Sequence, residues 1–477
     1  MVKIIRREIR DLYKNNFEEF SRFIIALNNL MNSPDWFRIC AIHGVAFLEG
    51  DKEIKCEVDS RKIEILMNNG EPVYCCHGDD RFLVWHRVYL NEFERMIQLY
   101  DKSNNLVPLA LPYFNWFDVT NDVEIFNRDE IEILQEGQTI KVFNPLKSGK
   151  IYDSSSSSIY TANNGEYTTR NGELFTNRLN LGNFNTQVIS LAKKSLSSPN
   201  YETLSSNSIF SQERDPTFSF KDFTQRNSLE ISHNNFHMIA GGRGGSMSSV
   251  PTAPYDLIFW LHHNNVERLF CIWQKSILDS NRDVLSSQYI LSEMMNKELP
   301  PFFSTGNNDL ENPLKYKFGW TNNTGIYTKI KEWFDPKLLK YEYDNEKMPS
   351  TMKELINIKM HYVVLYCAPV PLESLEIDLY IAPKYIFENS KDNEDIFKDE
   401  YKAATYYWFG LNRKKKNCKR CQENYLNLSF NITDFVKKND LIEKDFEDMV
   451  YRFIGKGLKD YPHEDIVGEG DIKLVFD

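Results

Sequence analysis

Histidine is scarce in this chain and unevenly distributed. Of nine histidines in 477 residues, all but His361 and His463 fall into two regions. The first region contains three and the second four: His43, His77 and His86, then His233, His237, His262 and His263. The segments around them are rich in aromatic and aliphatic residues, which predicts that the rings are buried. A buried imidazole without a partner is costly, and a bound metal would remove that cost.

The spacing of His233 and His237 narrows the choice of metal. Side chains four residues apart leave the same face of a helix, so both rings can reach one ion. Zinc hydrolases with this spacing require a glutamate beside the first histidine, but Asn234 stands there. Non-haem iron sites usually add a carboxylate ligand, and none occurs at matching spacing. Two sites made only of histidine favour copper.

The composition excludes several classes of protein. With 42% hydrophobic and 14% aromatic residues the chain can form substantial cores, and its length predicts two or three domains. A net charge of −11 with scattered basic residues argues against nucleic acid as a partner. No apolar run is long enough to cross a membrane, so no membrane partner is expected. The charged amino terminus lacks the apolar core of a signal peptide, which favours an intracellular protein.

Helices must position most of these histidines. Apolar residues recur at helical spacing in five segments: 17–31, 36–48, a segment that begins at Trp85, 228–242 and 256–278. Between them, the segment from 146 to about 215 is rich in Ser and Asn, which predicts a surface insertion.

The pattern changes near residue 350. Apolar and polar residues then alternate, as is typical of strands, in 375–381, 426–432 and 472–476. Alternation with turn-rich gaps predicts a β-sandwich or barrel. We therefore expect a helical domain over 1–345, followed by a smaller all-β domain over 346–477.

The histidine motifs resemble those of type-3 copper proteins, the family of tyrosinases, catechol oxidases and molluscan-type haemocyanins. "HGDDRFLVWHRVYLNEFE" (77–94) is similar to the first copper motif of that family. "HNNFH" (233–237) with "DLIFWLHHNNVERLFCIWQ" (256–274) is similar to the second. The resemblance implies a mainly α amino-terminal domain with a four-helix-bundle dicopper core. It also implies that the smaller, sandwich-like carboxy-terminal domain can cover the copper site, with 405–411 as a plausible blocking region.

The resemblance also implies the copper ligands. One copper would be held by His43, His77 and His86, and the other by His233, His237 and His263. His262, in contrast, would support the ligands or serve packing.

Three departures from the family pattern affect only residues that support the ligands. The usual Asp-Pro is Asp256-Leu257, the usual Asp-Arg is Glu267-Arg268, and "LPYWDW" is replaced by "LPYFNW" (111–116).

The same resemblance implies an activity. The two coppers would bind O₂ as peroxide, and the protein would oxidise phenols and o-diphenols to o-quinones. Glu230 and Asn234 would hold the water that deprotonates a monophenol. Molluscan haemocyanins share that pattern, however, so reversible binding or storage of O₂ is the alternative function. The expected partners are O₂ and, for an enzyme, a small phenolic substrate.

The cysteines raise a further expectation. Cys75 stands two residues before His77, and the resemblance implies a thioether between them; the alternative is a pair of thiols without a crosslink. Cys76 either pairs with Cys56 or remains a thiol. Cys418 and Cys421 form one Cys-x-x-Cys motif, which predicts a loop clip or two thiols.

Overall fold

The structure is a computed structural model, and it describes a defined part of the chain. The described residues are 3–43, 75–77, 80–103, 105–119, 123–151, 167–175, 179, 181–198, 200–205, 228–250, 252–303, 327–346, 361–369, 375–389, 397–408, 425–457, 464–465 and 472–476. Cys56, Cys418, Cys421, His463 and residues 409–411 of the predicted blocking region therefore lie outside the described residues.

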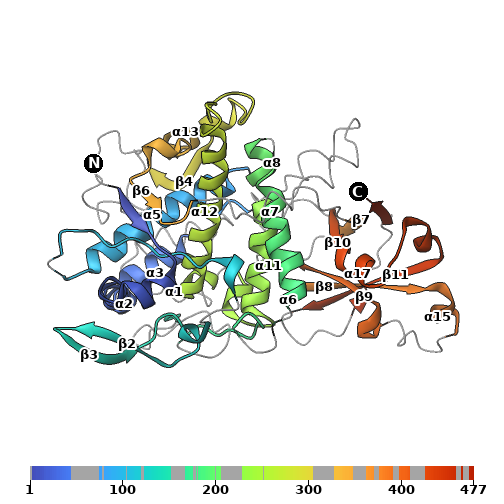
Figure 1. The fold of residues 1–477 in the computed structure, drawn as a ribbon, viewed down its shortest axis with the longest axis horizontal. Coiled ribbons are helices and arrows are strands. Elements are labelled where there is room, and N and C mark those ends of the chain that lie inside the picture. Colours follow the sequence, from blue (N-terminus) through green and yellow to red (C-terminus); the bar gives the residue numbers. More distant parts are fainter. Residues whose placement is uncertain are drawn as a thin grey trace, which may run out of the picture.

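Four helices form the centre of the molecule. They are α2 (Phe17–Met31), α5 (Phe82–Tyr100), α11 (Leu229–Gly241) and α12 (Leu257–Leu278). α2 packs against α5, α5 against α12, and α12 against α11 (Figure 1). Phe93 of α5 stacks on Trp260 of α12, with ring centroids 3.7 Å apart. The predicted helical core is thereby confirmed, although the helix predicted from Trp85 begins three residues earlier, at Phe82.

Shorter helices surround this core. They are α1 (Ile9–Asn15), α3 (Pro34–Ala41), α6 (Leu181–Phe184), a π-helical turn (Asn185–Ser190), α7 (Leu191–Ser195), α8 (Tyr201–Ser205) and α13 (Ile330–Trp333). Of the helix predicted over 36–48, α3 covers the part up to Ala41, and turn conformation follows at Ile42 and His43, whereas residues 44–48 lie outside the described residues. No helix in the described ranges combines the length and the apolarity that crossing a membrane requires.

The core also contains three two-stranded sheets. These are the pairs β1 (Ile4–Arg6) with β6 (Tyr341–Tyr343), β2 (Glu130–Gln135) with β3 (Gln138–Phe143), and β4 (Glu298–Phe303) with β5 (Tyr327–Lys329). The parallel β1–β6 pair joins the two ends of the helical region. Arg6 is fully buried there, with its guanidinium carbon 3.4 Å from the ring centroid of Tyr341. It donates to Glu94 of α5 and Asn264 of α12, at 2.8 and 2.9 Å, and so connects both helices to β1.

The segment expected to be a surface insertion is built into the core where it is described. Arg170 donates two hydrogen bonds to the carboxylate of Asp256, which caps the amino terminus of α12. Val188 and Leu204 are fully buried in the main apolar core. The prediction of a surface segment is wrong for these residues, because their apolar and ionic side chains are in contact with α11 and α12.

The carboxy-terminal part contains two antiparallel sheets. One has the strand order β10–β7–β13, and the other β12–β11–β8–β9. The strands are β7 (His361–Pro369), β8 (Leu375–Pro383), β9 (Lys402–Trp408), β10 (Tyr425–Asn431), β11 (Met449–Gly457), β12 (Glu464–Asp465) and β13 (Ile472–Phe476). The strands predicted at 375–381, 426–432 and 472–476 are present as β8, β10 and β13.

Residues of both sheets share one apolar cluster, which includes Val363, Leu379 and Phe453. Two helices, α15 (Lys384–Asn389) and α17 (Thr433–Lys438), interrupt the strands. An all-β domain is therefore not confirmed. In Figure 1 these strands lie beside α11 and α6, and β9 contacts α11.

Candidate metal centre

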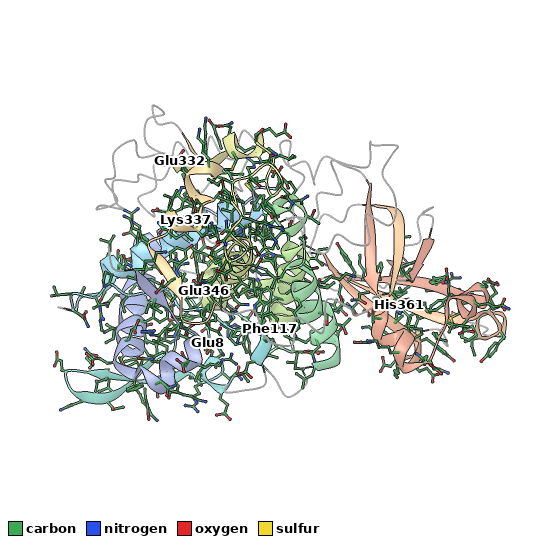
Figure 2. All side chains as sticks on the ribbon, turned by 45° about the horizontal axis from the view of Figure 1, so that its top comes forward. Glu8, Phe117, Glu332, Lys337, Glu346 and His361 are labelled. Carbon is green, nitrogen blue, oxygen red and sulfur yellow. The ribbon has the colours of Figure 1, made fainter. Side chains whose placement is uncertain are left out.

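Seven histidines from four parts of the core converge at one place. His43 follows α3, His77 precedes α5, and His86 lies on α5. The other four come from α11 and α12: His233, His237, His262 and His263. All seven are buried. His361 lies apart from them, at the first residue of β7 in the carboxy-terminal part (Figure 2).

The tightest group lies between α11 and α12. The Nε2 atom of His233 is 3.0 Å from the Nε2 atoms of both His237 and His263, and the latter two are 3.4 Å apart. The four-residue spacing places His233 and His237 on one face of α11, as predicted. Asp256 begins α12 by accepting a hydrogen bond from the amide of Ile258, although the usual proline is absent.

For His233 and His237, a hydrogen bond at the opposite ring atom directs Nε2 toward the group. The Nδ1 atom of His237 donates to the carbonyl of Met247 at 2.8 Å, and that of His233 lies 3.0 Å from Oδ1 of Asn234. An imidazole that donates from Nδ1 presents a lone pair at Nε2. Lone pairs that face one another at this distance fit a shared cation, because imidazole binds such metals at about 2.0–2.1 Å.

The first histidine region lies directly beside this group. The Nδ1 atom of His86 donates to the carbonyl of Phe82 at 2.8 Å, and that of His43 to the carbonyl of Val250 at 3.0 Å. The Nε2 atom of His86 is buried and has no hydrogen-bond partner among the described residues. The rings of His86 and His263 stack with centroids 4.3 Å apart. The two regions therefore form one continuous imidazole cluster.

The predicted triad of His43, His77 and His86 is divided between two close sets. Possible ligand atoms of His43, His86 and His263 lie within 4.8 Å of one another, and so do those of His43, Cys75 and His77. His77 is thus next to His43 and also next to the cysteine expected to crosslink it. His263 lies in the set with His43 and His86 and also in the group with His233 and His237.

Burial keeps five of these imidazoles neutral. It lowers the pKa of His86 to about 3, although the hydrogen bond to the Phe82 carbonyl opposes that shift. Burial likewise lowers the pKa of His237 to about 3. The pKa values of His233, His262 and His263 fall well below their usual range, first by burial and then by the neighbouring imidazoles. Neutral rings at pH 7 are ready to bind a metal without releasing protons.

His262 packs against aromatic rings and lies beside the predicted ligands. Its ring stacks on Phe236 at 4.1 Å and on Trp116 at 5.1 Å. Its nitrogens have no hydrogen-bond partner among the described residues, and a possible ligand atom lies within 4.8 Å of the His233 group. Packing is confirmed, but the ring also lines the cluster.

Glu230 and Asn234 both lie on α11. Glu230 is buried one turn before His233, and Asn234 contacts the ring of His233 through Oδ1. The described contact of Asn234 therefore orients His233.

A buried ion pair connects the helices of the two groups. Arg87, the last residue of the Trp-His-Arg triplet, donates from Nε to Oε1 of Glu267 and from Nη2 to Gln274, both at 2.8 Å. Tyr341 donates to the same Oε1 atom at 2.7 Å. Glu267 stands where an aspartate is usual, and it still forms an ion pair between α5 and α12. The sequence singled out neither Arg6 nor Arg170, because no local pattern marks an arginine that pairs across the fold.

Comparison with known proteins gives a consistent result. The family model described as the common central domain of tyrosinase matches residues 34–276, just over half of the chain. A tyrosinase of Podospora anserina is 27% identical over 310 residues, which cover 57% of this chain and 51% of that protein. Unit D of the hemocyanin beta-C chain of Helix pomatia is 27% identical over 308 residues, covering 62% and 59%. The match spans less than two thirds of either relative.

Solved structures show the same fold at low sequence identity. An oxygen-bound pro-tyrosinase mutant of Aspergillus oryzae has a TM-score of 0.66 at 16% identity, over 100% of this chain and 92% of that one. Deoxygenated hemocyanin from Rapana thomasiana has a TM-score of 0.62 at 17% identity, over 100% of both chains. The buried histidine groups fit the dicopper centre of such proteins. This chain therefore belongs to the tyrosinase family of type-3 dicopper proteins, which has both tyrosinases and hemocyanins among its members.

Proposed function

We propose that this protein is an oxidase of phenols and o-diphenols that uses O₂ and releases o-quinones. One copper would be held by His43, His77 and His86, and the other by His233, His237 and His263. The observation that carries the proposal is the convergence of three Nε2 atoms within 3.0–3.4 Å, directly beside a second set of buried imidazoles. Tyrosinase relatives support an oxidoreductase.

Two copper ions held there would supply a two-electron exchange with O₂, which would match the two electrons lost when a diphenol becomes a quinone. The protein's own contribution is orientation and a dry site. Carbonyls of Phe82, Met247 and Val250 fix the rings of three histidines. The low pKa values of His86 and His237 keep these rings unprotonated throughout the physiological range. Another group must therefore accept the protons that the substrate loses.

Glu230 is the proposed acceptor of a monophenol's proton, through a water held with Asn234. Support comes from its burial in the first turn of α11, one turn before His233. Glu230→Gln preserves the shape and removes the base. Hydroxylation of tyrosine should fall at least tenfold while oxidation of catechol changes little, because catechol needs no hydroxylation step. Unchanged hydroxylation would remove Glu230 from the mechanism.

We further propose that residues 346–477 form a separate, sandwich-like domain that shields the copper site in 1–345. Support comes from the contact between β9 and α11, the helix that carries His233 and His237. Thr186 also donates to the carboxylate of Asp434, which joins the two parts. Proteolysis between 347 and 360 should raise oxidation of phenols without changing the copper content.

Reversible binding of O₂ is the second candidate function. It is favoured by the hemocyanin relative, which is as similar to this chain as the tyrosinase is. One experiment separates the two functions. The copper-loaded protein is treated with peroxide, its oxygenated absorption band is recorded, and catechol and tyrosine are then added. Turnover supports the oxidase, and a band without turnover, before and after proteolytic trimming, supports the carrier.

A further inference from the structure

A single loop contacts one histidine in each of the two groups. Residues 242–250, named here the orienting loop, follow α11 directly. The carbonyl of Met247 accepts a hydrogen bond from Nδ1 of His237, at 2.8 Å. The carbonyl of Val250 accepts one from Nδ1 of His43, at 3.0 Å. Because these are backbone oxygens, their positions are set by the path of the loop and not by any side chain within it.

We propose that the orienting loop is a shared positioning element that fixes one ligand of each copper site. A change in the loop would then alter the copper affinity of both sites. The proposal rests on the ligand sets given under the proposed function. A carbonyl that accepts from Nδ1 determines both the tautomer and the rotation of a metal-binding imidazole, and loss of such a partner weakens metal binding about 10–100-fold. A disturbance of the loop should therefore weaken both sites.

The path of the loop depends on glycines that admit no side chain. A Cβ atom at Gly245 would lie 1.9 Å from the carbonyl oxygen of Gly241. One at Gly241 would lie 2.2 Å from Oγ of Ser248. Gly242 has a φ of +63°, in the left-handed region that favours glycine. The turn can thus form only with these residues, and it places Met247 and Val250 within reach of the two rings.

Two side-chain hydrogen bonds close the loop on itself. Ser248 donates from Oγ to the carbonyl of Gly242 at 2.5 Å. Thr252 donates from Oγ1 to the carbonyl of Ser246 at 2.7 Å. Both acceptors are carbonyls of the orienting loop, so these bonds restrict the loop rather than the histidines directly. They offer a way to loosen the loop without changing a ligand.

The segment 168–172 supports the loop from its other side. The amide of Ser246 donates to the carbonyl of Thr169 at 2.8 Å, and Nδ2 of Asn171 donates to that of Arg243 at 2.8 Å. The neighbouring Arg170 holds Asp256 at the start of α12, the helix that carries His263. The same short segment therefore supports the loop and the helix of a third ligand.

Two other proposed ligands, His86 and His233, supply an internal contrast. His86 is oriented by the carbonyl of Phe82, one turn earlier in its own helix. His233 is oriented by the next residue, Asn234. Both partners are local, so these rings do not depend on the orienting loop. The orienting loop therefore couples the two sites through His43 and His237.

The test uses a matched pair of variants. Ser248→Ala removes the hydroxyl that closes the loop. Ser195→Ala removes an equally buried hydroxyl that donates to the carbonyl of Leu191, at 2.7 Å, on α7. Gly245→Ala, which forces the turn to change, is the stronger variant, and Ser248→Ala serves if that one does not fold. Each is loaded with copper and titrated with a chelator while the ions retained per chain are counted. Thermal unfolding of the copper-free protein is measured in parallel.

We expect both coppers of Ser248→Ala to bind about tenfold more weakly than those of Ser195→Ala, at equal stability of the copper-free proteins. The proposal would be overturned if only one copper, or neither, bound more weakly in Ser248→Ala. It would also be overturned if both coppers bound equally weakly in the control, Ser195→Ala. The outcome is separable from the proposed function, since the wild-type protein must itself bind two coppers and oxidise catechol. If it does and Ser248→Ala matches the control, the inference about the loop alone fails.

Discussion

The two histidine groups are built in different ways. His233, His237 and His263 come from two continuous helices, and their Nε2 atoms converge within 3.0–3.4 Å. In the first group, only His86 lies within a helix; His43 follows the end of α3, and His77 lies in a short segment before α5. Helical geometry places the second group, in which the Met247 carbonyl also orients His237, whereas the first group depends mainly on contacts between distant segments. The first group should therefore be the more easily disturbed of the two.

The largest expected effect comes from the residue that both groups share. Possible ligand atoms of His263 lie within 4.8 Å of those of His43 and His86, and also of those of His233 and His237. His263→Ala should reduce copper to at most one ion per chain and abolish oxidation of catechol, because each site loses part of its surroundings. Elemental analysis after dialysis measures this. His361→Ala, outside the cluster, should retain two ions; two ions in His263→Ala would show that His263 is not a required ligand.

The buried pair that joins the helices of the two groups should affect stability next. Arg87 and Glu267 are 2.8 Å apart and both buried. Arg87→Met leaves the carboxylate without its cation and should lower the free energy of unfolding by about 3–5 kcal/mol. Urea denaturation measures the change. Lys147→Met removes the exposed partner of Asp129 and should cost only about 0–1 kcal/mol. Equal effects of the two substitutions would contradict the role given to Arg87.

The pH dependence of the copper-free protein's stability reports the burial of His237. Because burial lowers the pKa of His237 to about 3, the unfolded chain binds a proton there before the folded protein does. Stability contributed by the neutral ring is fully present above about pH 6.5 and is lost as the pH falls from there toward 3. Each such ring contributes a slope of at most about 1.4 kcal/mol per pH unit.

We therefore expect His237→Asn to reduce the slope of the unfolding free energy against pH between pH 6 and pH 5. The reduction should correspond to at most about one proton taken up on unfolding. Urea denaturation across this range measures the slope. The wild-type protein, measured in parallel, is the reference. An unchanged slope in His237→Asn would mean that this ring is already protonated in the folded protein.

The smallest expected effect concerns the crosslink in the first group. Ligand atoms of Cys75, His77 and His43 lie within 4.8 Å of one another. A thioether between Cys75 and His77 would lower the intact mass by two hydrogens, and thiol reductants would not reverse the change. Cys75→Ser should restore the uncrosslinked mass and increase the rate of copper loss modestly, since His77 gains rotational freedom. A wild-type mass that equals that of the sequence would exclude the crosslink.

The sequence predicted the second group better than the first, for the same structural reason. The four-residue spacing of His233 and His237 and the periodicity of α12 are local signals, and both were correct. The position of His77 depends on the fold around it, and its closest set includes Cys75 rather than His86. Local patterns carry no information about such contacts.

Some supporting groups have no signature in the sequence at all. The carbonyls of Met247 and Val250 orient two histidines, but every residue has a carbonyl. Arg170 stands in a Ser- and Asn-rich segment that predicted a surface insertion, yet it pairs with Asp256 inside the core. The carboxy-terminal strands were predicted by their alternation, whereas α15 and α17 are too short for helical periodicity to mark them.

The most direct test of the central claim is to locate copper itself in a crystal of the loaded protein. Anomalous scattering at the copper absorption edge should give two adjacent peaks. One should lie among the Nε2 atoms of His233, His237 and His263, and the other among His43, His77 and His86. A single peak, or a second peak bound by Cys75 in place of His86, would contradict the claim that two histidine groups hold one copper each.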